Sequence, residues 1–339
     1  MDVLYYIAII AMTPAPFWIW LVCGLALVIL SGWLFLRRRR NASRPFNLLS
    51  LLITAFISIA GAYMVFMGIY QFCYTHRPLP APTQQQLYKG ITYIRDVRTS
   101  PRPLVIHVVE VQLDEDGIRF LVTPGDPAQD YPVRAQTVSQ FLTQYDLQLA
   151  INGDFFEPWW SNGIFDYYPH VGDGADPLGF ASSEGVIYSD QLENHPTLYI
   201  SQDNQLSLTV SDGEEYNAIS GSIVLISNGE VELPRDEQYH TDLHPRTALG
   251  WSEDANTLII VVVDGRQPNY SEGVSLYELA DIMQAYGAYM ALNIDGGGSS
   301  TLVMEGETGE PIVLNSPIDQ RIPGRERPVA NHLGIFTVR

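Results

Sequence analysis

The stretch "ALNIDGGGSSTLV" (291–303) joins two apolar runs through an aspartate, three glycines and two serines. Short apolar runs bounded by turn residues predict buried strands. Asp295 then ends the first strand, and the loop of residues 296–300 can bring its backbone N–H groups close to a ligand. A tight turn in which Asp295 bonds only its own backbone fits the same spacing. This stretch alone therefore does not distinguish a ligand site from a plain turn, and the rest of the sequence has to be considered.

Three further segments share this design of an apolar strand with polar residues and glycine at its end. They are "LAINGDFF" (149–156), "HPRTALG" (244–250) and "IIVVVDGR" (259–266). A strand fixes the residue at its end, which projects into any cleft that the loops form. Arg246 and Arg266 stand at two of these ends, and a guanidinium matches phosphate or carboxylate oxygens. They indicate an anionic ligand, unless each pairs with a structural carboxylate.

Many short β-branched runs and few helical patterns follow residue 100, which predicts an α+β domain with mixed or antiparallel sheets. Two helices are expected, at 135–145 and at 275–287, where Ser275 and Glu278 fit a capping box. "SNGE" (227–230) predicts a hairpin turn. The expected strands are 104–113, 118–122, 149–151, 197–200, 205–210, 222–226, 247–251, 257–264, 289–295, 300–304 and 333–338.

The N-terminal part is different in kind. Residues 17–36 and about 47–70 are apolar and lack acidic residues, which predicts two transmembrane helices within a membrane anchor over residues 1–72. The arginine-rich loop between them, residues 37–46, is expected to stay in the cytoplasm. The N-terminus and the C-terminal domain, residues 101–339, would then lie on the extracytoplasmic side of the cell membrane. Residues 73–100, rich in proline and glutamine at 77–86, would form a linker and lead-in.

The chain beyond residue 72 is strongly acidic. It holds 14 of the 19 basic and 37 of the 38 acidic residues, a formal charge of −23, with Lys89 as its only lysine. Such a surface repels polyanions, so we expect no nucleic-acid partner. An anionic substrate can still bind through a few arginines. Cys23 and Cys73 belong to the membrane segments, so we expect an outer domain without disulfides.

Several other chemistries lack their motifs. There is no His/Cys cluster with zinc spacing, no GxSxG nucleophile elbow and no GK[ST] P-loop, so we expect no metal and no cofactor. The capping box accounts for Glu278, although its carboxyl group could also act as a general acid or base. The loop with His170, Asp173 and Asp176 fits a cation site or simple turns. The segment 155–180, rich in Gly, Pro and aromatic residues, is typical of an active-site loop.

Taken together, these blocks closely resemble the phosphodiester glycosidase family. The resemblance rests on "HPRTALG" (244–250), "VVVDGRQPNYSEGVSLYELADIMQAYGAYMALNIDGGGSSTLV" (261–303) and, more weakly, "INGDFF" (151–156). "SGSIVLISNG" (220–229) and "RPVANHLGIF" (327–336) continue it, so that it covers about residues 104–339 in order. Asp154 stands where the family more often has glycine, which adds a negative charge near the expected site.

The resemblance implies hydrolysis of the bond from sugar C1 to the phosphate oxygen in a glycosyl phosphodiester, with a role in envelope or exopolysaccharide metabolism. It suggests Asp295 as the catalytic carboxylate, Asp264 as the second choice and His244 as an assisting acid. Arg246 and Arg266 would hold the phosphate. The other residues that would bind the sugar or phosphate are Asn152, Asp154, Gly296, Gly297, Ser299, Ser300, Thr301, Arg327 and Asn331.

Two other functions stay open at this point. One is a non-catalytic module that binds glycans or takes part in their assembly on the same fold. Joint retention of Asp264, Asp295, Arg246 and Arg266 favours the enzyme, since a binding module would be free to lose some of them. The other is a conventional glycosidase with two carboxylates, Asp154 and Asp295. The sequence leaves the sugar, the phosphate substituent, the stereochemical outcome and the oligomeric state open.

Overall fold

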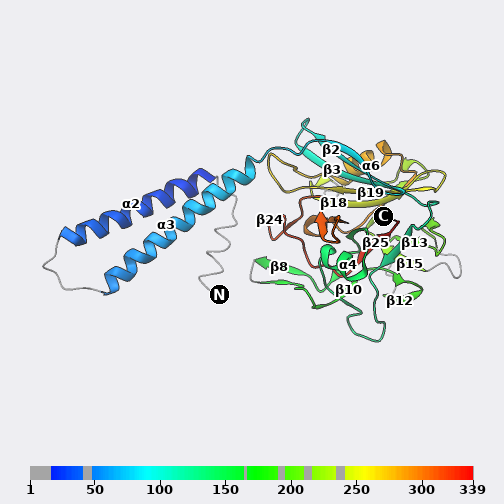
Figure 1. The fold of residues 1–339 in the computed structure, drawn as a ribbon, viewed down its shortest axis with the longest axis horizontal. Helices are drawn as coiled ribbons and strands as arrows, with labels where there is room; N and C mark the ends of the chain where they lie inside the picture. Colours follow the sequence, from blue (N-terminus) through cyan, green and yellow to red (C-terminus); the bar gives the residue numbers. More distant parts are fainter. Residues whose placement is uncertain are drawn as a thin grey trace. The chain divides into compact units, whose positions relative to one another are not determined.

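The computed structural model describes residues 17–40, 48–163, 166–189, 195–209, 216–233 and 241–338. The chain divides into two compact units, Met1–Pro78 and Leu79–Arg339 (Figure 1). Each unit has its own internal packing and is described by itself.

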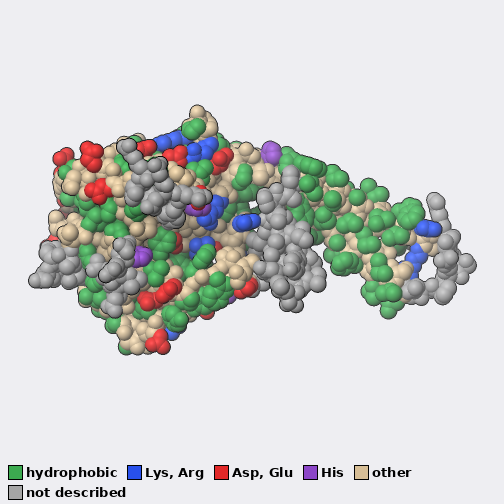
Figure 2. All heavy atoms as spheres, turned by 180° about the vertical axis from the view of Figure 1, so that it is seen from behind, with side chains coloured by type: hydrophobic (Ala, Val, Ile, Leu, Met, Phe, Trp, Pro, Cys, Tyr) green, Lys and Arg blue, Asp and Glu red, His purple; other side chains and the backbone are tan. Residues whose placement is uncertain are grey.

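The first unit consists of two long apolar helices, α2 (Phe17–Arg40) and α3 (Leu48–Thr75). Both are long and apolar enough to cross a bilayer by length and composition. Hydrophobic side chains cover most of their visible face in Figure 2. Both helices run past the predicted spans, so the arginines at 37–40 continue α2 instead of opening the expected loop; residues 41–47 lie outside the described residues.

Small residues bring α2 and α3 close together. A Cβ added at Gly24 would lie 2.7 Å from the backbone nitrogen of Val65 and 2.9 Å from the carbonyl oxygen of Gly61. A Cβ at Gly68 would lie 2.7 Å from the side chain of Leu21. Such close backbone approach is the packing that apolar helices use when both are surrounded by lipid.

The second unit is an α+β domain in which every paired strand in the named sheets is antiparallel. Its largest sheet has eight strands, in the order β1-β2-β3-β19-β18-β20-β16-β17. Their bounds are β1 Thr83–Tyr88, β2 Ile91–Arg98, β3 Leu104–Gln112, β19 Thr257–Val263, β18 Arg246–Trp251, β20 Met290–Asn293, β16 Ile223–Ser227 and β17 Glu230–Val231.

Two five-stranded sheets form the other half. One runs β22-β21-β6-β25-β4 and the other β12-β11-β15-β13-β14. The bounds are β22 Pro311–Val313, β21 Leu302–Glu305, β6 Leu149–Asn152, β25 His332–Phe336, β4 Arg119–Val122, β12 Val186–Ser189, β11 Ala181–Ser183, β15 Asn217–Ser220, β13 Thr197–Ile200 and β14 Leu206–Ser207. Short ladders complete the unit: β5 (Val133–Arg134), β10 (Gly174–Pro177) and β7 (Phe156–Glu157), β8 (Trp160–Gly163) with β9 (Asp166–Tyr168), and β23 (Ile318–Asp319) with β24 (Ile322–Pro323).

Alternating apolar residues build two cores on the faces of the eight-stranded sheet. Leu249 of β18 packs toward the five-stranded sheets, whereas its neighbour Ala248 packs toward α6 (Leu276–Ala285). Helix α4 (Val138–Tyr145) covers the outer face of the β6 sheet through Phe141 and Leu142. The layers therefore run helix, sheet, sheets, helix, with α6 and α4 on opposite sides in Figure 1.

The strand, helix and hairpin predictions are confirmed with shifts of a few residues at the ends. Ser275 and Glu278 form the predicted capping box. Asn228 and Gly229 have positive φ angles of 51° and 80° at the predicted β16–β17 turn.

The structure differs from the prediction over residues 73–100, because residues 83–98 form β1 and β2. Ile91 and Tyr93 of β2 are fully buried, so this segment belongs to the domain core and not to a linker. The glutamines of β1 are exposed because β1 is the edge of the sheet. A polar edge strand and a polar linker therefore gave the same sequence pattern.

Candidate active site

Three of the four predicted strand ends meet at one cavity of about 300 Å³. Strand β18 lies between β19 and β20 and runs antiparallel to both. Its first residue, Arg246, is therefore next to the last residues of β19 and β20, where Asp264 and Asp295 follow. The cavity is lined by His244, Arg246, Arg266, Asp295, Gly296, Gly297, Gly298 and Arg327, with an apolar side formed by Phe155, Phe156, Trp159 and Leu178.

Asp295 is the only carboxylate among the described residues that line this cavity. It is 8% exposed, and burial raises its pKa to about 6 despite the opposing effect of Arg327, the Ser299 hydroxyl, the Gly296 N–H and Arg266. The Gly296 N–H donates to Asp295 Oδ1 at 2.7 Å. The predicted turn contact is therefore present, and the same aspartate lines a cavity.

Arg327 contacts the site from the segment before β25. It donates from Nε to Asp319 Oδ1 at 3.0 Å and from a terminal nitrogen to the Ser299 hydroxyl at 3.2 Å. Its guanidinium carbon lies 5.2 Å from the centre of the Trp159 ring. A Cβ on Gly298 would overlap this guanidinium, so glycine is required there for Arg327 to reach the cavity.

Arg266 and His244 form a second cationic contact. Arg266 adopts a φ of +58°, and its terminal nitrogen lies 3.2 Å from His244 Nδ1. A guanidinium can only donate, so Nδ1 accepts and the proton of a neutral imidazole is on Nε2. Burial, Arg266 and Arg246 lower the pKa of His244, which makes it a neutral donor at pH 7 and not a cationic acid. Burial and neighbouring Arg327 and Arg246 likewise lower the pKa of Arg266.

Arg246 is buried and donates to two backbone oxygens, of Val274 at 3.4 Å and of Asp242 at 3.2 Å. Three guanidinium groups therefore share a cavity with one carboxylate. The sequence placed Arg246 and Arg266 at strand ends and the family resemblance named Arg327, and the structure brings all three to one cavity.

The apolar side of the cavity comes from the segment that was predicted to be an active-site loop. Phe155, Phe156, Trp159 and Leu178 all belong to residues 155–180. Ladders β7–β10 and β8–β9 give this segment its shape. His170 and Asp173 of the same segment bond each other at 3.2 Å and do not line the cavity, and no group of three metal-ligating side chains occurs among the described residues.

Several predicted ligand-binding residues lie behind the cavity and do not line it. Asn152 is fully buried: its amide donates to the Asp295 carbonyl at 2.7 Å and accepts from the Thr247 hydroxyl at 2.9 Å and the Thr301 N–H at 3.2 Å. It fixes the backbone at Asp295. The side chains of Ser299, Ser300, Thr301 and Asn331 are also buried and outside the lining.

Asp154 is buried beside Asn331 and does not line the cavity. Its carboxyl accepts from the Asn331 amide and from the Ser220 N–H. Burial raises its pKa well above the usual value, and nearby Asp295 adds to this effect. This geometry does not provide the pair of cavity carboxylates that the two-carboxylate glycosidase hypothesis needs.

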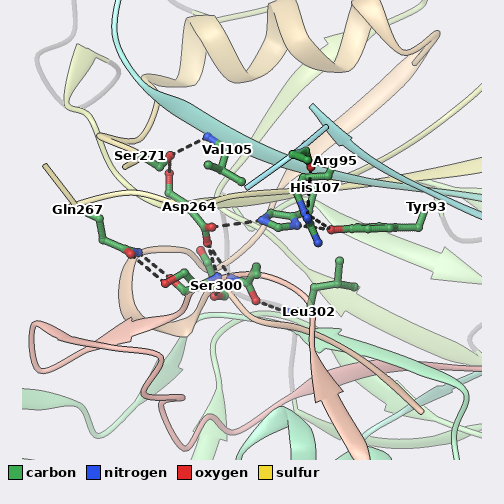
Figure 3. Close-up of polar contacts among 12 residues, drawn as sticks. Tyr93, Arg95, Val105, His107, Asp264, Gln267, Ser271, Ser300 and Leu302 are labelled. Atoms are coloured by element: carbon green, nitrogen blue, oxygen red, sulfur yellow. Dashed lines mark hydrogen bonds and ion pairs between the residues drawn. The ribbon is translucent and has the colours of Figure 1, made fainter. Parts of the chain in front are cut away.

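Asp264 also lies outside the cavity lining, in the network drawn in Figure 3. His107, Asn315 and Ser316 surround its carboxylate. The sequence analysis did not find these three residues, or Asp319, because none lies in a segment that combines an apolar strand with glycine. Glu278 caps α6 and pairs with Arg102 at 2.5 Å, away from the cavity.

Comparison with known sequences agrees with this geometry. The sequence profile of the phosphodiester glycosidases matches residues 145–336. The chain belongs to the phosphodiester glycosidase family. All of the cavity-lining residues fall inside the matched range.

The relatives within this range are distant. Human N-acetylglucosamine-1-phosphodiester alpha-N-acetylglucosaminidase is 25% identical over 205 residues, which are 55% of this chain and 37% of the relative. The SPbeta prophage-derived uncharacterized protein YomE of Bacillus subtilis is 29% identical over 194 residues, 54% of this chain and 28% of the relative. The chain thus spans about a third of the length of these curated relatives.

Solved structures share the fold. The zebrafish N-acetylglucosamine-1-phosphodiester alpha-N-acetylglucosaminidase catalytic domain, auto-inhibited by its pro-peptide, has a TM-score of 0.53 at 21% identity, covering 78% of this chain and 86% of that chain. A hypothetical protein from Synechocystis has a TM-score of 0.56 at 16% identity, covering 76% and 64%. At these identities the likeness concerns the fold alone.

Proposed function

We propose that this protein is a hydrolase that cleaves the bond from sugar C1 to the phosphate oxygen in glycosyl phosphodiesters. The observation that carries the proposal is the cavity in which Arg246, Arg266 and Arg327 face a single buried carboxylate, Asp295. Three cations around one carboxylate leave an excess of positive charge in a domain that is otherwise acidic. An anionic ligand is the natural complement of this charge.

The arginines match the leaving group. When the bond to C1 breaks, the phosphodiester becomes a phosphomonoester and gains negative charge. Guanidinium groups fixed in a partly buried site stabilise that developing charge without reorganising. A phosphomonoester of this kind leaves without a strong acid, which agrees with a neutral His244.

Asp295 suits the sugar side of the reaction. With a pKa of about 6 it is mostly ionised at pH 7. A carboxylate next to C1 stabilises the oxocarbenium-like transition state as a nucleophile, as a base for water, or by its charge. The apolar wall with Trp159 would take the face of the sugar ring or the phosphate substituent.

We further propose that α2 and α3 anchor the protein in the cell membrane with the second unit outside the cytoplasm, where envelope or exopolysaccharide glycans would be its substrates. Lys89, the only lysine of the chain, allows a direct test. A membrane-impermeant amine reagent added to intact cells should label Lys89. Labelling only after the cells are opened would place the domain in the cytoplasm.

The test of the enzymatic function is sugar release by the full-length chain in detergent. A panel of sugar-1-phosphodiesters and matched sugar ethers without phosphate is incubated with the parent and with Asp295→Asn. Release from the phosphodiesters alone supports the proposal. Release from the ethers would favour a conventional glycosidase. Binding of the phosphodiesters without any release would favour the glycan-binding module.

A further inference from the structure

Asp264 has the sequence setting of a catalytic carboxylate, an apolar strand followed by glycine and arginine, but a different environment. Its carboxylate is 1% exposed and receives three hydrogen bonds: from the Ser316 N–H at 2.8 Å, the Asn315 amide at 3.1 Å and His107 Nε2 at 3.2 Å. Asp264 does not line the cavity. A buried carboxylate held in this way acts on the parts of the chain that supply its donors.

Asn315, one of the donors to Asp264, connects it to the glycine-rich loop. The Asn315 amide that donates to Asp264 also donates to the Ser300 carbonyl at 3.0 Å, and its oxygen accepts from the Leu302 N–H at 2.9 Å. Asn315 therefore holds both ends of the three-residue step from Ser300 to Leu302. This step directly follows the glycine loop that lines the cavity, so its position fixes where that loop ends.

The second part leads to Arg266. Ser316 and Gln267 exchange two hydrogen bonds, at 2.7 Å from the Gln267 amide to the Ser316 carbonyl and at 2.9 Å from the Ser316 hydroxyl to the Gln267 side-chain oxygen. Gln267 is the residue after Arg266, whose backbone is in the left-handed region. The turn at 315–316 thus connects the Arg266 loop to the glycine loop, and Asp264 holds this turn.

On the side of β2 and β3, a chain of hydrogen bonds from Arg95 through Tyr93 and His107 reaches Asp264 (Figure 3). Arg95 donates from Nε to the Tyr93 hydroxyl oxygen at 3.2 Å, and the Tyr93 hydroxyl lies 2.8 Å from His107 Nδ1. Because Arg95 can only donate, the Tyr93 hydroxyl is free to donate to Nδ1. His107 then carries its proton on Nε2, facing Asp264. Every polar group along this path has a partner in one consistent arrangement.

We infer that Asp264 is a positioning residue, which sets the glycine loop and Arg266 around the bound anion through the turn at 315–316. It does not touch the reacting atoms. The inference deepens the proposed function, on which its kinetic arm rests, but its binding arm needs only that the cavity takes an anion.

The test compares three variants of the full-length chain in detergent. Asn315→Ala removes the link between Asp264 and the glycine loop. His107→Phe removes one donor of Asp264 but leaves both links to the cavity, so it is the matched control. Asp264→Asn keeps an oxygen that can accept from Asn315 and Ser316. Inorganic phosphate is the probe, with its Kd measured by calorimetry beside Tm, kcat, KM and the pH–rate profile.

We expect Asn315→Ala to weaken phosphate binding about tenfold, the size of a lost fixed contact. His107→Phe should lower Tm because a buried hydrogen bond to Asp264 is lost. It should leave the phosphate Kd within about twofold, because both links from Asp264 to the cavity remain. Asp264→Asn should retain activity within about tenfold, with the acid limb of the pH–rate profile unmoved, because a positioning residue does not exchange the proton that limits the rate.

Three results would overturn the inference. A loss of the acid limb in Asp264→Asn would give Asp264 a part in proton transfer. Equal losses of phosphate binding in His107→Phe and Asn315→Ala, in proportion to Tm, would reduce the network to general stability. Unchanged phosphate binding in a folded Asn315→Ala variant would show that the contact between Asn315 and the glycine loop does not position the anion site. If the parent binds phosphate but hydrolyses no phosphodiester, the proposed reaction fails while the positioning role is still decided by the binding data.

Discussion

Two strand ends of the same sheet, at Asp264 and at Asp295, have the same sequence design but different environments. Both aspartates follow a buried strand beside β18 and precede a glycine. Asp264 receives its hydrogen bonds from His107, Asn315 and Ser316. Asp295 instead faces a cavity together with Arg266 and Arg327.

This difference indicates that the groups surrounding a buried carboxylate determine whether its role is structural or chemical. Three hydrogen bonds from within the fold hold the Asp264 carboxylate, which does not line the cavity. Asp295 accepts from the Gly296 N–H at 2.7 Å, and the Ser299 hydroxyl, Arg327 and Arg266 also favour its charged form. A buried carboxylate with few hydrogen-bond donors lowers the stability of the fold, and a loss of stability of this kind is typical of active sites.

The largest expected effect is on turnover. Asp295→Asn should lower kcat about 10³-fold, because the carboxylate charge next to C1 is lost. Asp264→Asn is the matched control, since it makes the same atomic change at the other strand end and should cost less than tenfold. Free sugar released from a sugar-1-phosphodiester measures both. Equal losses at the two positions would end the distinction between them.

Arg327→Gln should lower kcat/KM about 10²-fold, which is the usual cost of one group that stabilises developing charge. It should also move the acid limb of the pH–rate profile upward. Arg327 lowers the pKa of Asp295, which burial has raised to about 6, so without the cation the carboxyl protonates at higher pH. An unshifted limb would show that the limb belongs to another group. The same profile measured for Arg95→Gln, at the far end of the Asp264 network, is the control.

Stability should change in opposite directions at the two strand ends. The pKa of Asp295 is about 6 in the folded chain and about 3.9 when unfolded, so the folded state binds more protons between these values. The free energy of unfolding therefore falls by about 2 kcal/mol as the pH rises from 4 to 6, out of about 3 kcal/mol over the whole range from below the unfolded pKa to above the folded one. Asp295→Asn lacks this loss, so its advantage over the parent should be small at pH 4 and full at pH 7.

Asp264→Asn should instead be less stable than the parent at pH 7, because hydrogen bonds to a charged acceptor are replaced by weaker ones, at a cost of about 1–3 kcal/mol. Urea unfolding of the parent and both variants at pH 4 and pH 7 measures this. All other titrating groups are common to the three proteins and cancel in the differences. A stabilised Asp264→Asn would contradict the comparison.

The smallest effect concerns the apolar wall, which only the Asp295 end has. Trp159→Ala should raise KM about tenfold with little change in kcat, because the indole lines the cavity under the Arg327 guanidinium and in the proposed reaction would contact the ligand but not the bond that breaks. Trp160→Ala is the control, since Trp160 packs on Tyr168 and does not line the cavity. Equal KM values for the two variants would remove Trp159 from the site.

The sequence predicted the elements of the domain well because their patterns are local. Alternating apolar residues, the Ser275 capping box and the Asn228–Gly229 turn each depend on a few adjacent residues. The same reasoning failed at β1, where an exposed edge strand has the composition of a linker. It also found the strand ends at Asp295, Arg246 and Arg266, since a strand followed by glycine is a local pattern.

The environments of these strand ends could not be predicted, because they depend on residues distant in the sequence. Asp264 is distinguished by Asn315, which no sequence pattern marked, and Asp295 by Arg327, which the family resemblance named without placing it beside Asp295. Asp154 was placed in the site by its neighbours in the chain, yet Ser220 and Asn331 enclose it. Family resemblance identified the region of the site but not which of its residues face the cavity.

The position of β3 in the largest sheet has a consequence for the order in which the molecule is made. Val108 of β3 lies opposite Val261 of β19, and no strand between them in the sequence takes that place. During synthesis the apolar edge "LVIHVVEVQ" must therefore wait for about half of the chain to emerge before it is paired. Pairings this distant make folding slow and leave an edge open to association with other chains. The cavity likewise needs most of the chain before it can form, because its lining residues run from Phe155 to Arg327.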